Sequence, residues 1–213
     1  MKRTGCFQKE VAGFISAYFA MGLDSVEMLV RFEKYFEVDV PDAVAETLFT
    51  PADTAAWISQ QLAIPTTAHS PGREAVAQQL QVLFAAHAPD AKTKLAYLLP
   101  TGEAWAQYAR QLTNQTGWQL PDIGWLQPPR ARGWLNQLFD WNISITPPDP
   151  NPYRFADLVD WTLARNYGLL LTKPLQNQYE VLQAVIGITS DSSGVEVSEI
   201  KPDSSFTRDL GID

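Results

Sequence analysis

The chain has few of the side chains that most catalytic and metal sites need. It contains one cysteine, Cys6, and two histidines, His69 and His87. A single cysteine cannot form an internal disulfide or a multi-thiolate metal site, which favours a reducing compartment. Neither histidine has a carboxylate or cysteine at metal-ligand spacing, and the sequence has no GxSxG, P-loop or glycine-rich dinucleotide motif. We therefore expect no catalytic residue, no metal site and no enzymatic activity.

Positive charge and long hydrophobic runs are also scarce. Lysine and arginine number 16 against 24 aspartates and glutamates, for a net charge of −8. This balance argues against nucleic acid and anionic membrane surfaces as partners. The apolar run from Val11 to Leu23 is too short to span a bilayer and continues into a helical pattern without a cleavage site. We therefore expect a cytoplasmic protein with no membrane partner.

An amphipathic pattern fills residues 21–62. Apolar residues at spacings of three and four predict one buried helical face, formed by Val26, Leu29, Val30, Phe32 and Phe36. Asp24 precedes most of this run and Glu27 follows three residues later, as in a capping box. An acidic turn ending at Pro41, a second short helix and a last helix from about Pro51 complete the predicted unit.

This stretch resembles the second half of an acyl carrier protein. The resemblance rests on Met21-Gly-Leu-Asp-Ser-Val-Glu, on EKYFEVDVPD and on TPADTAAW from Thr50. In that family a serine after an aspartate opens the second helix and carries 4′-phosphopantetheine, so the resemblance implies Asp24 and Ser25 as a cofactor site. An ungapped match instead places Gly22 at the attachment point, with Ser25 facing outward one turn into the helix. The resemblance therefore leaves open a carrier with an arm and a carrier-like protein without one.

A second copy of the unit is predicted further along the chain. Gly102 and Pro121 lie as far apart as Gly22 and Pro41, and ADLVDW from Ala156 matches ADTAAW in register. Thr101-Gly102-Glu103 stands where a carrier needs its Asp-Ser pair, so the second copy is expected to have no arm. Its insertion is rich in tryptophan and arginine: Trp125, Arg130, Arg132, Trp134 and Trp141.

The C-terminal residues resemble the first half of a carrier domain, which the N-terminal unit lacks. Residues 176–213 begin with the apolar helical face of Tyr179, Leu182, Val185 and Ile186 and continue as SSGVEVSEIKPDSSFTRDLGID. This segment resembles the first helix of a carrier protein and the long loop that leads to its attachment point. We therefore predict that residues 174–213 complete the N-terminal module as a circularly permuted bundle. Docking within one chain and exchange between two chains, giving a homodimer, are both compatible with the sequence.

These patterns predict an all-α fold of small helical bundles in two carrier-like modules. The expected divisions are residues 1–63, a linker at 64–73, a second module at 74–173, and residues 174–213, which complete the first. The predicted function is a protein–protein interaction module that binds protein partners through its acidic second helix or its tryptophan-rich insertion, without a prosthetic arm. The alternative is a true acyl or peptidyl carrier with 4′-phosphopantetheine on Ser25.

Overall fold

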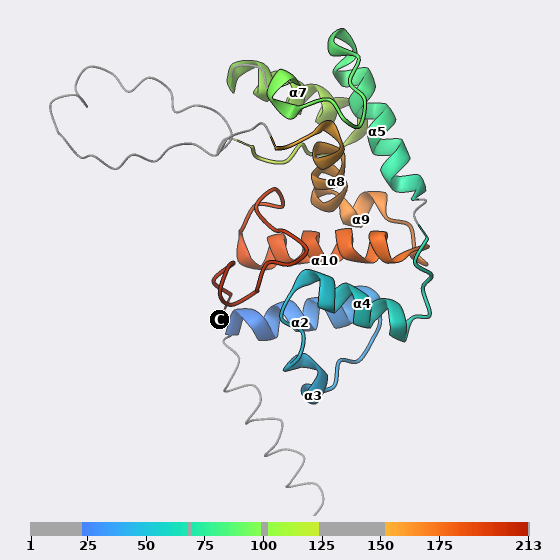
Figure 1. Cartoon of the computed structure of the whole chain (residues 1–213), viewed down its shortest axis with the longest axis vertical. Coiled ribbons are helices and arrows are strands. Elements are labelled where there is room, and N and C mark those ends of the chain that lie inside the picture. Colours follow the sequence, from blue (N-terminus) through green and yellow to red (C-terminus); the bar gives the residue numbers. More distant parts are fainter. Residues whose placement is uncertain (1–22, 68–69, 99–101, 124–151, 213) are drawn as a thin grey trace, which may run out of the picture. The chain divides into compact units, whose positions relative to one another are not determined.

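The described part of the chain is helical throughout. The computed structural model describes residues 23–67, 70–98, 102–123 and 152–212. Within these ranges the chain forms nine α-helices, one short 3-10 helix and no strand, apart from an isolated bridge between Lys94 and Arg154 (Figure 1). The all-α prediction is confirmed for these residues.

Two compact units divide the chain. The first comprises Met1–Gly72 with Ala164–Asp213, and the second comprises Arg73–Leu163. The expected second module, residues 74–173, therefore extends ten residues too far. Residues 164–173 belong to the first unit because Ala164 and Tyr167 pack closely against Gly187.

The linker is shorter than the expected residues 64–73. Helix α5 (Pro71–Leu83) already begins inside that range. Proline suits the first turn of a helix, because its φ angle is already helical and its missing N–H would have no partner there. The predicted linker includes Pro71, although a proline just before a helical pattern is itself a signal for the start of a helix.

The first unit is organised around one central helix. It contains α2 (Leu23–Phe36), α3 (Asp42–Ala45), α4 (Pro51–Gln61), α9 (Tyr167–Leu170) and α10 (Gln178–Ser193). Helix α10 packs against α2, α4 and α9 of the same chain, and Figure 1 shows α2 and α4 lying alongside it. The sequence predicted one apolar face for α10, but most of its residues from Glu180 to Ser190 are buried. A helix that is apolar on nearly every side is a buried helix, so α10 supplies the centre of this core.

Capping residues set both ends of α10. The Asn177 side chain accepts a hydrogen bond from the Glu180 N–H at 2.9 Å, and Glu180 accepts one from the Gln176 N–H at 2.9 Å. These reciprocal bonds satisfy N–H groups that have no partner within the helix. Gly194 ends the helix with a φ of 74°, a left-handed conformation that glycine adopts without strain.

The chain after α10 returns to the start of α4. The Ala52 N–H donates to the Pro202 carbonyl at 2.8 Å, and the Phe206 N–H donates to the Phe49 carbonyl at 3.0 Å. Val197, Ile200, Phe206 and Ile212 are buried along this segment. Residues 176–212 are therefore docked on residues 23–62 within one chain, and exchange between two chains stays a prediction.

The second unit contains η1 (Ala85–His87), α6 (Leu95–Leu98), α7 (Gly102–Thr116) and most of α5 and α8 (Phe155–Arg165). Its core is aromatic at one point, where the Phe84 ring stacks on Trp105 with centroids 6.2 Å apart and contacts Tyr108 at 4.8 Å. Other buried members of this core are Val76, Leu80, Leu95, Leu98, Leu112, Ile123, Leu158 and Leu163.

The two units bury equivalent helix positions. Helix α4 buries Pro51, Thr54, Ala55, Ile58 and Ser59, and the same steps along α8 are Phe155, Leu158, Val159, Thr162 and Leu163, all buried. The match extends in part to α2 and α7 and to the residues that follow them. Ser25, Phe32 and Val40 correspond to Trp105, Leu112 and Leu120, all of them buried, whereas the buried residues Met28 and Phe36 correspond to Tyr108 and Thr116, which are half-buried.

Two backbone hydrogen bonds are also repeated in register. In the second unit the Leu95 N–H donates to the Tyr153 carbonyl at 2.9 Å, and the Ala156 N–H donates to the Ala91 carbonyl at 3.4 Å. Tyr153 precedes α8 by the same number of residues as Phe49 precedes α4, and Ala156 is the second residue of its helix, as Ala52 is. The spacing from Ala91 to Leu95 also equals that from Pro202 to Phe206. In both units, therefore, an irregular segment is held on a helix start by the same pair of bonds.

Candidate functional site

The start of α2 holds both residues that the sequence indicated as a cofactor site. Ser25, Met28, Phe32 and Phe36 are the buried residues of this helix, and their spacing of three, four and four defines its inner face. The predicted face was therefore partly wrong: Phe32 and Phe36 lie on it, but Val30 is 46% exposed. Ser25 was expected to face outward in the ungapped match and is instead only 7% exposed.

The Ser25 hydroxyl is directed towards the C-terminal segment. It donates a long hydrogen bond to the Ile212 carbonyl at 3.5 Å, and Ile212 is itself buried. Figure 1 shows the C-terminal end beside the first turn of α2. The hydroxyl oxygen is thus enclosed between α2 and the main chain of the C-terminal segment. A serine that is to carry 4′-phosphopantetheine must present this oxygen to a transferase, so Ser25 does not fit the group in this arrangement.

Asp24 has a different environment from its neighbour. Helix α2 begins at Leu23, so Asp24 lies within the first turn rather than at the cap position that the sequence indicated. It is exposed, and a carboxylate in the first turn is stabilised by the positive end of the helix dipole. Gly22, the other candidate attachment position, lies outside the described residues.

The outer face of α2 and the residues that follow it are acidic. Residues 23–46 contain seven acidic side chains and two basic ones, Arg31 and Lys34. Arg31 is already engaged, because its guanidinium pairs with Glu27 one turn earlier at 2.7 Å. Val30 stands exposed on the same helix. The result is a surface of net negative charge with one apolar side chain exposed on it.

A tyrosine pair lies on the side of α10 where α9 packs. The rings of Tyr35 and Tyr167 meet edge to face with centroids 5.2 Å apart, and the Tyr167 hydroxyl donates to the Asp191 carboxylate at 3.2 Å. Burial, together with the Asp191 charge, raises the pKa of Tyr167 to about 12. Burial and the charge of Glu180 raise the pKa of Tyr35 as well. Both hydroxyls thus stay protonated at neutral pH, which suits packing better than acid–base chemistry.

Within the described ranges, the remaining sequence-based candidates do not assemble into a reactive centre. His87 is exposed, whereas His69 lies outside the described residues. Among the residues that the structure places, no cluster of three or more histidine, cysteine, aspartate or glutamate side chains could hold a metal ion. Every helix in the described part of the chain is too short or too polar to cross a bilayer.

The tryptophan-rich insertion of the second unit is largely outside the described residues, and Trp125, Arg130, Arg132, Trp134 and Trp141 all fall there. Trp118, just before it, is half-buried, and Trp105 lies in the core of the unit. The prediction of a partner-binding surface at the insertion therefore stays a prediction.

No protein-family model matches the chain, and no solved structure matches it significantly.

Proposed function

We propose that the chain is a non-enzymatic, acyl-carrier-like interaction protein made of two related helical modules, neither of which carries a prosthetic arm. The resemblance to carrier proteins supports the family assignment. The equivalent buried positions and the repeated backbone hydrogen bonds support a common origin for the two modules. In the first unit the equivalent of the leading helix is α10, which follows the other helices in the chain, so this module is the permuted one.

The enclosure of Ser25 is the observation that carries the proposal. Its hydroxyl is buried and engaged with the Ile212 carbonyl, although it is the serine nearest the carrier motif. The second module has Thr101-Gly102-Glu103 at the equivalent place, without an Asp-Ser pair. A serine hydroxyl accessible to a transferase is thus missing from the described residues of both motif helices.

The acidic surface of α2 and α3 is the proposed partner site. Its seven acids would steer a protein with a basic patch, because opposite charges speed the encounter of two proteins. Val30 would then be buried in the contact; full burial of an exposed apolar side chain contributes about 1.5–3 kcal/mol, and Val30, which is 46% exposed, would gain about half of that. The tryptophan-rich insertion is the second surface that the sequence predicts for protein partners.

Intact mass tests the absence of an arm. The chain is coexpressed with a broad-specificity phosphopantetheinyl transferase, with a known carrier protein as positive control. We expect the mass of the unmodified chain. A gain of one phosphopantetheine group that disappears in Ser25→Ala would establish the alternative, a true acyl or peptidyl carrier.

Introducing a positive charge at one of two exposed valines tests the partner surface. Val30→Arg places a cation on the acidic face, whereas Val82→Arg makes the same change at a valine on α5 that is more exposed, at 68% against 46% for Val30. A partner cross-linked to the wild-type chain in cells of its source should be lost with Val30→Arg and kept with Val82→Arg. Equal retention by both variants would refute the placement of the site on α2.

A further inference from the structure

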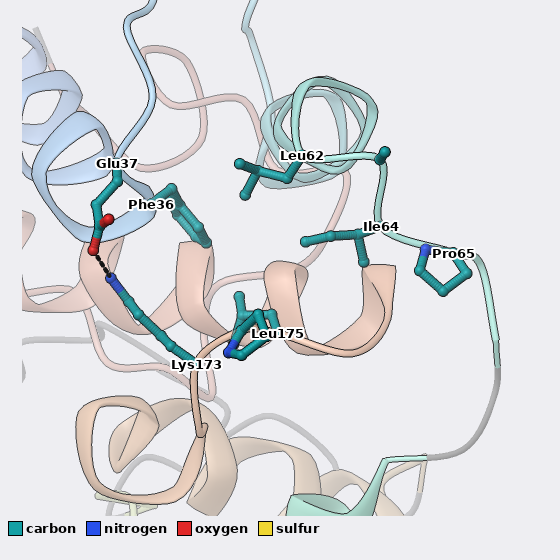
Figure 2. A pocket seen from close by; sticks show the side chains of 9 residues that line it. Phe36, Glu37, Leu62, Ile64, Pro65, Lys173 and Leu175 are labelled. Atoms are coloured by element: carbon teal, nitrogen blue, oxygen red, sulfur yellow. Dashed lines mark hydrogen bonds and ion pairs between the residues drawn. The ribbon is translucent and has the colours of Figure 1, made fainter.

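A cavity of about 600 Å³ opens at the far end of the first unit from Ser25. Its lining comes from three segments: the end of α2, the end of α4 with the residues after it, and the residues before α10. Figure 2 shows the side chains of Phe36, Leu62, Ile64 and Leu175 around one shared space. Phe36 and Leu175 are buried in the unit, whereas Leu62 is 39% exposed. The volume falls within the range of about 300–1,000 Å³ that is typical of small-molecule sites.

The backbone in the wall of this cavity has few hydrogen-bond donors to offer. The N–H groups of Leu62, Ala63 and Ile64 donate to carbonyls of Ile58, Gln60 and Ser59 respectively. Pro65 and Pro174 also line the cavity and have no N–H. A ligand that needed several backbone donors would lose hydrogen bonds with water here and regain few. The wall therefore disfavours a ligand that must accept several hydrogen bonds, whereas the side chains of Phe36, Leu62, Ile64 and Leu175 offer it apolar contacts.

The charges at the cavity cancel one another. Lys173 and Glu37 pair at 3.3 Å, as the dashed line in Figure 2 shows. The Lys173 ammonium also donates to the Tyr35 carbonyl and lies 4.7 Å from the centre of the Tyr35 ring. An ion of either sign would meet one like charge of this pair and would lose hydration on entering the cavity; the negative C-terminal ends of α2 and α4 add to the repulsion of an anion and offset part of the cost for a cation. An uncharged ligand meets neither penalty.

We propose that this cavity binds an uncharged, predominantly aliphatic small molecule. The site lies at the opposite end of α2 from Ser25 and shares only Glu37 with the seven acids of the proposed partner surface; Val30, at which that surface is tested, does not line the cavity. Failure of the interaction function would therefore leave this proposal intact, and failure of this proposal would leave the interaction function intact. The hydrocarbon part of the ligand would contact Phe36, Leu62, Ile64 and Leu175, and a hydroxyl or other neutral head group would remain at the opening beside the Lys173–Glu37 pair.

Three ligands of equal chain length and different charge test the proposal. Octanol, octanoate and octylammonium are titrated into the full chain at concentrations below micelle formation, and binding is followed by saturation-transfer NMR. Octanol should bind at least about tenfold more tightly than either ion, a difference of about 1.4 kcal/mol. Tighter binding of octanoate or octylammonium, or no binding of octanol, would overturn the proposal.

Two tryptophan substitutions, one at the cavity and one on the surface, show where the ligand binds. Leu62→Trp places an indole at the opening, whereas Leu169→Trp makes the same change at a 72% exposed position of α9 that does not line the cavity. Octanol affinity should fall at least about tenfold in Leu62→Trp and stay within about twofold in Leu169→Trp, provided that both variants keep the wild-type circular dichroism. Equal affinity in both variants would place the ligand elsewhere and refute the site. Glu37→Gln and Lys173→Gln give a second measurement: loss of octanol binding in either one would contradict recognition by the apolar wall.

Discussion

Gly187 of α10 lies close to the segment that contains Ala164 and Tyr167. A Cβ atom at this position would lie 2.3 Å from Cδ1 of Tyr167 and 2.4 Å from the backbone oxygen of Ala164. Carbon atoms in contact normally stand about 3.5–4.0 Å apart. The Tyr167 ring can rotate, but the Ala164 carbonyl belongs to the last turn of α8 and moves only with the main chain. Gly187→Ala must therefore separate α10 from the segment that contains Ala164 and Tyr167.

The size of this effect follows from two opposing contributions. Overpacking by one methyl group in a well-packed core costs about 1–3 kcal/mol. Alanine in place of glycine within a helix recovers about 1 kcal/mol of backbone entropy. Because two contacts are violated at once and one of them is main chain, we expect the overpacking to dominate and the first unit to lose about 1–2 kcal/mol. Gly168→Ala is the matched control, since a Cβ there meets nothing within 4 Å.

Amide hydrogen exchange measured by mass spectrometry follows the two units separately. Gly187→Ala should reduce the protection of peptides from α10, α2 and α4, whereas peptides from α7 in the second unit serve as an internal reference. Gly168→Ala should leave protection unchanged or raise it slightly. The reasoning is refuted if Gly187→Ala protects α10 as well as the wild-type chain does, because α10 would then have tolerated a side chain where the structure leaves no room.

Three further changes test other contacts of the first unit. Ser25→Gln should lower the free energy of unfolding by about 1–3 kcal/mol through overpacking and should raise hydrogen exchange in residues 195–212. Asp24→Gln, on the exposed side of the helix, should leave that segment protected. Equal exchange in the two variants would contradict the Ser25–Ile212 contact. Asn177→Ala should cost about 1 kcal/mol of unfolding free energy in urea denaturation by removing the cap of α10, and Asn177→Ser should recover most of that loss, which a role in packing alone would not predict. Folding raises the pKa of Tyr167 from its ordinary value of 10.0 to about 12, which adds stability that is complete below pH 10 and disappears as the pH rises towards 12. The urea midpoint of the wild-type chain should accordingly fall more steeply over this range than that of Tyr167→Phe, and parallel curves would show that the tyrosine does not contribute.

Local patterns predicted the helices well because their causes lie close together in the chain. Helix α4 was expected from about Pro51 and begins there, with Thr50 accepting a hydrogen bond from the Asp53 N–H at 3.1 Å. Proline at the first helical position and a hydroxyl just before it are signals that need no tertiary contact. The existence of α10 was predicted from its apolar repeat in the same way, although only one buried face was expected and most of its residues from Glu180 to Ser190 are buried.

The faces of α2 were harder to assign, and the error has a physical cause. The predicted buried face consisted of apolar residues only, so it included Val30 and left out Ser25. Positions 25, 28, 32 and 36 nevertheless follow the helical repeat closely. The angular position of a residue decides its burial at a helix start, and a small polar side chain can be buried there if it has a hydrogen-bond partner. Testing Ser25 against the stripe of Met28, Phe32 and Phe36 would have predicted its burial.

Apart from the docking of the C-terminal segment on the N-terminal unit, contacts between distant segments had no signal in the sequence. The Lys173–Glu37 pair joins residues 136 positions apart, and each is an ordinary charged residue in its own surroundings. The close approach of Tyr167 to Gly187 likewise depends on where α9 returns to α10. The cavity, which is lined by three separate segments, could therefore be recognised only in the folded chain.

Comparison of the two units gives a reason for the serine at position 25 that does not involve an arm. Its counterpart in the second unit is Trp105, which is buried and stacks on Phe84. The position is thus an inner one in both units, filled by an indole in one and by a hydroxymethyl group in the other. In the first unit the space beside it is occupied by the main chain of the C-terminal segment, whose Ile212 carbonyl comes within 3.5 Å of the Ser25 oxygen. A large side chain would push that segment away, whereas serine both leaves room and donates a hydrogen bond to the carbonyl. On this argument Ser25 serves the closure of a permuted bundle through its size and polarity, and its place in a motif like that of carrier proteins does not require a cofactor on its hydroxyl.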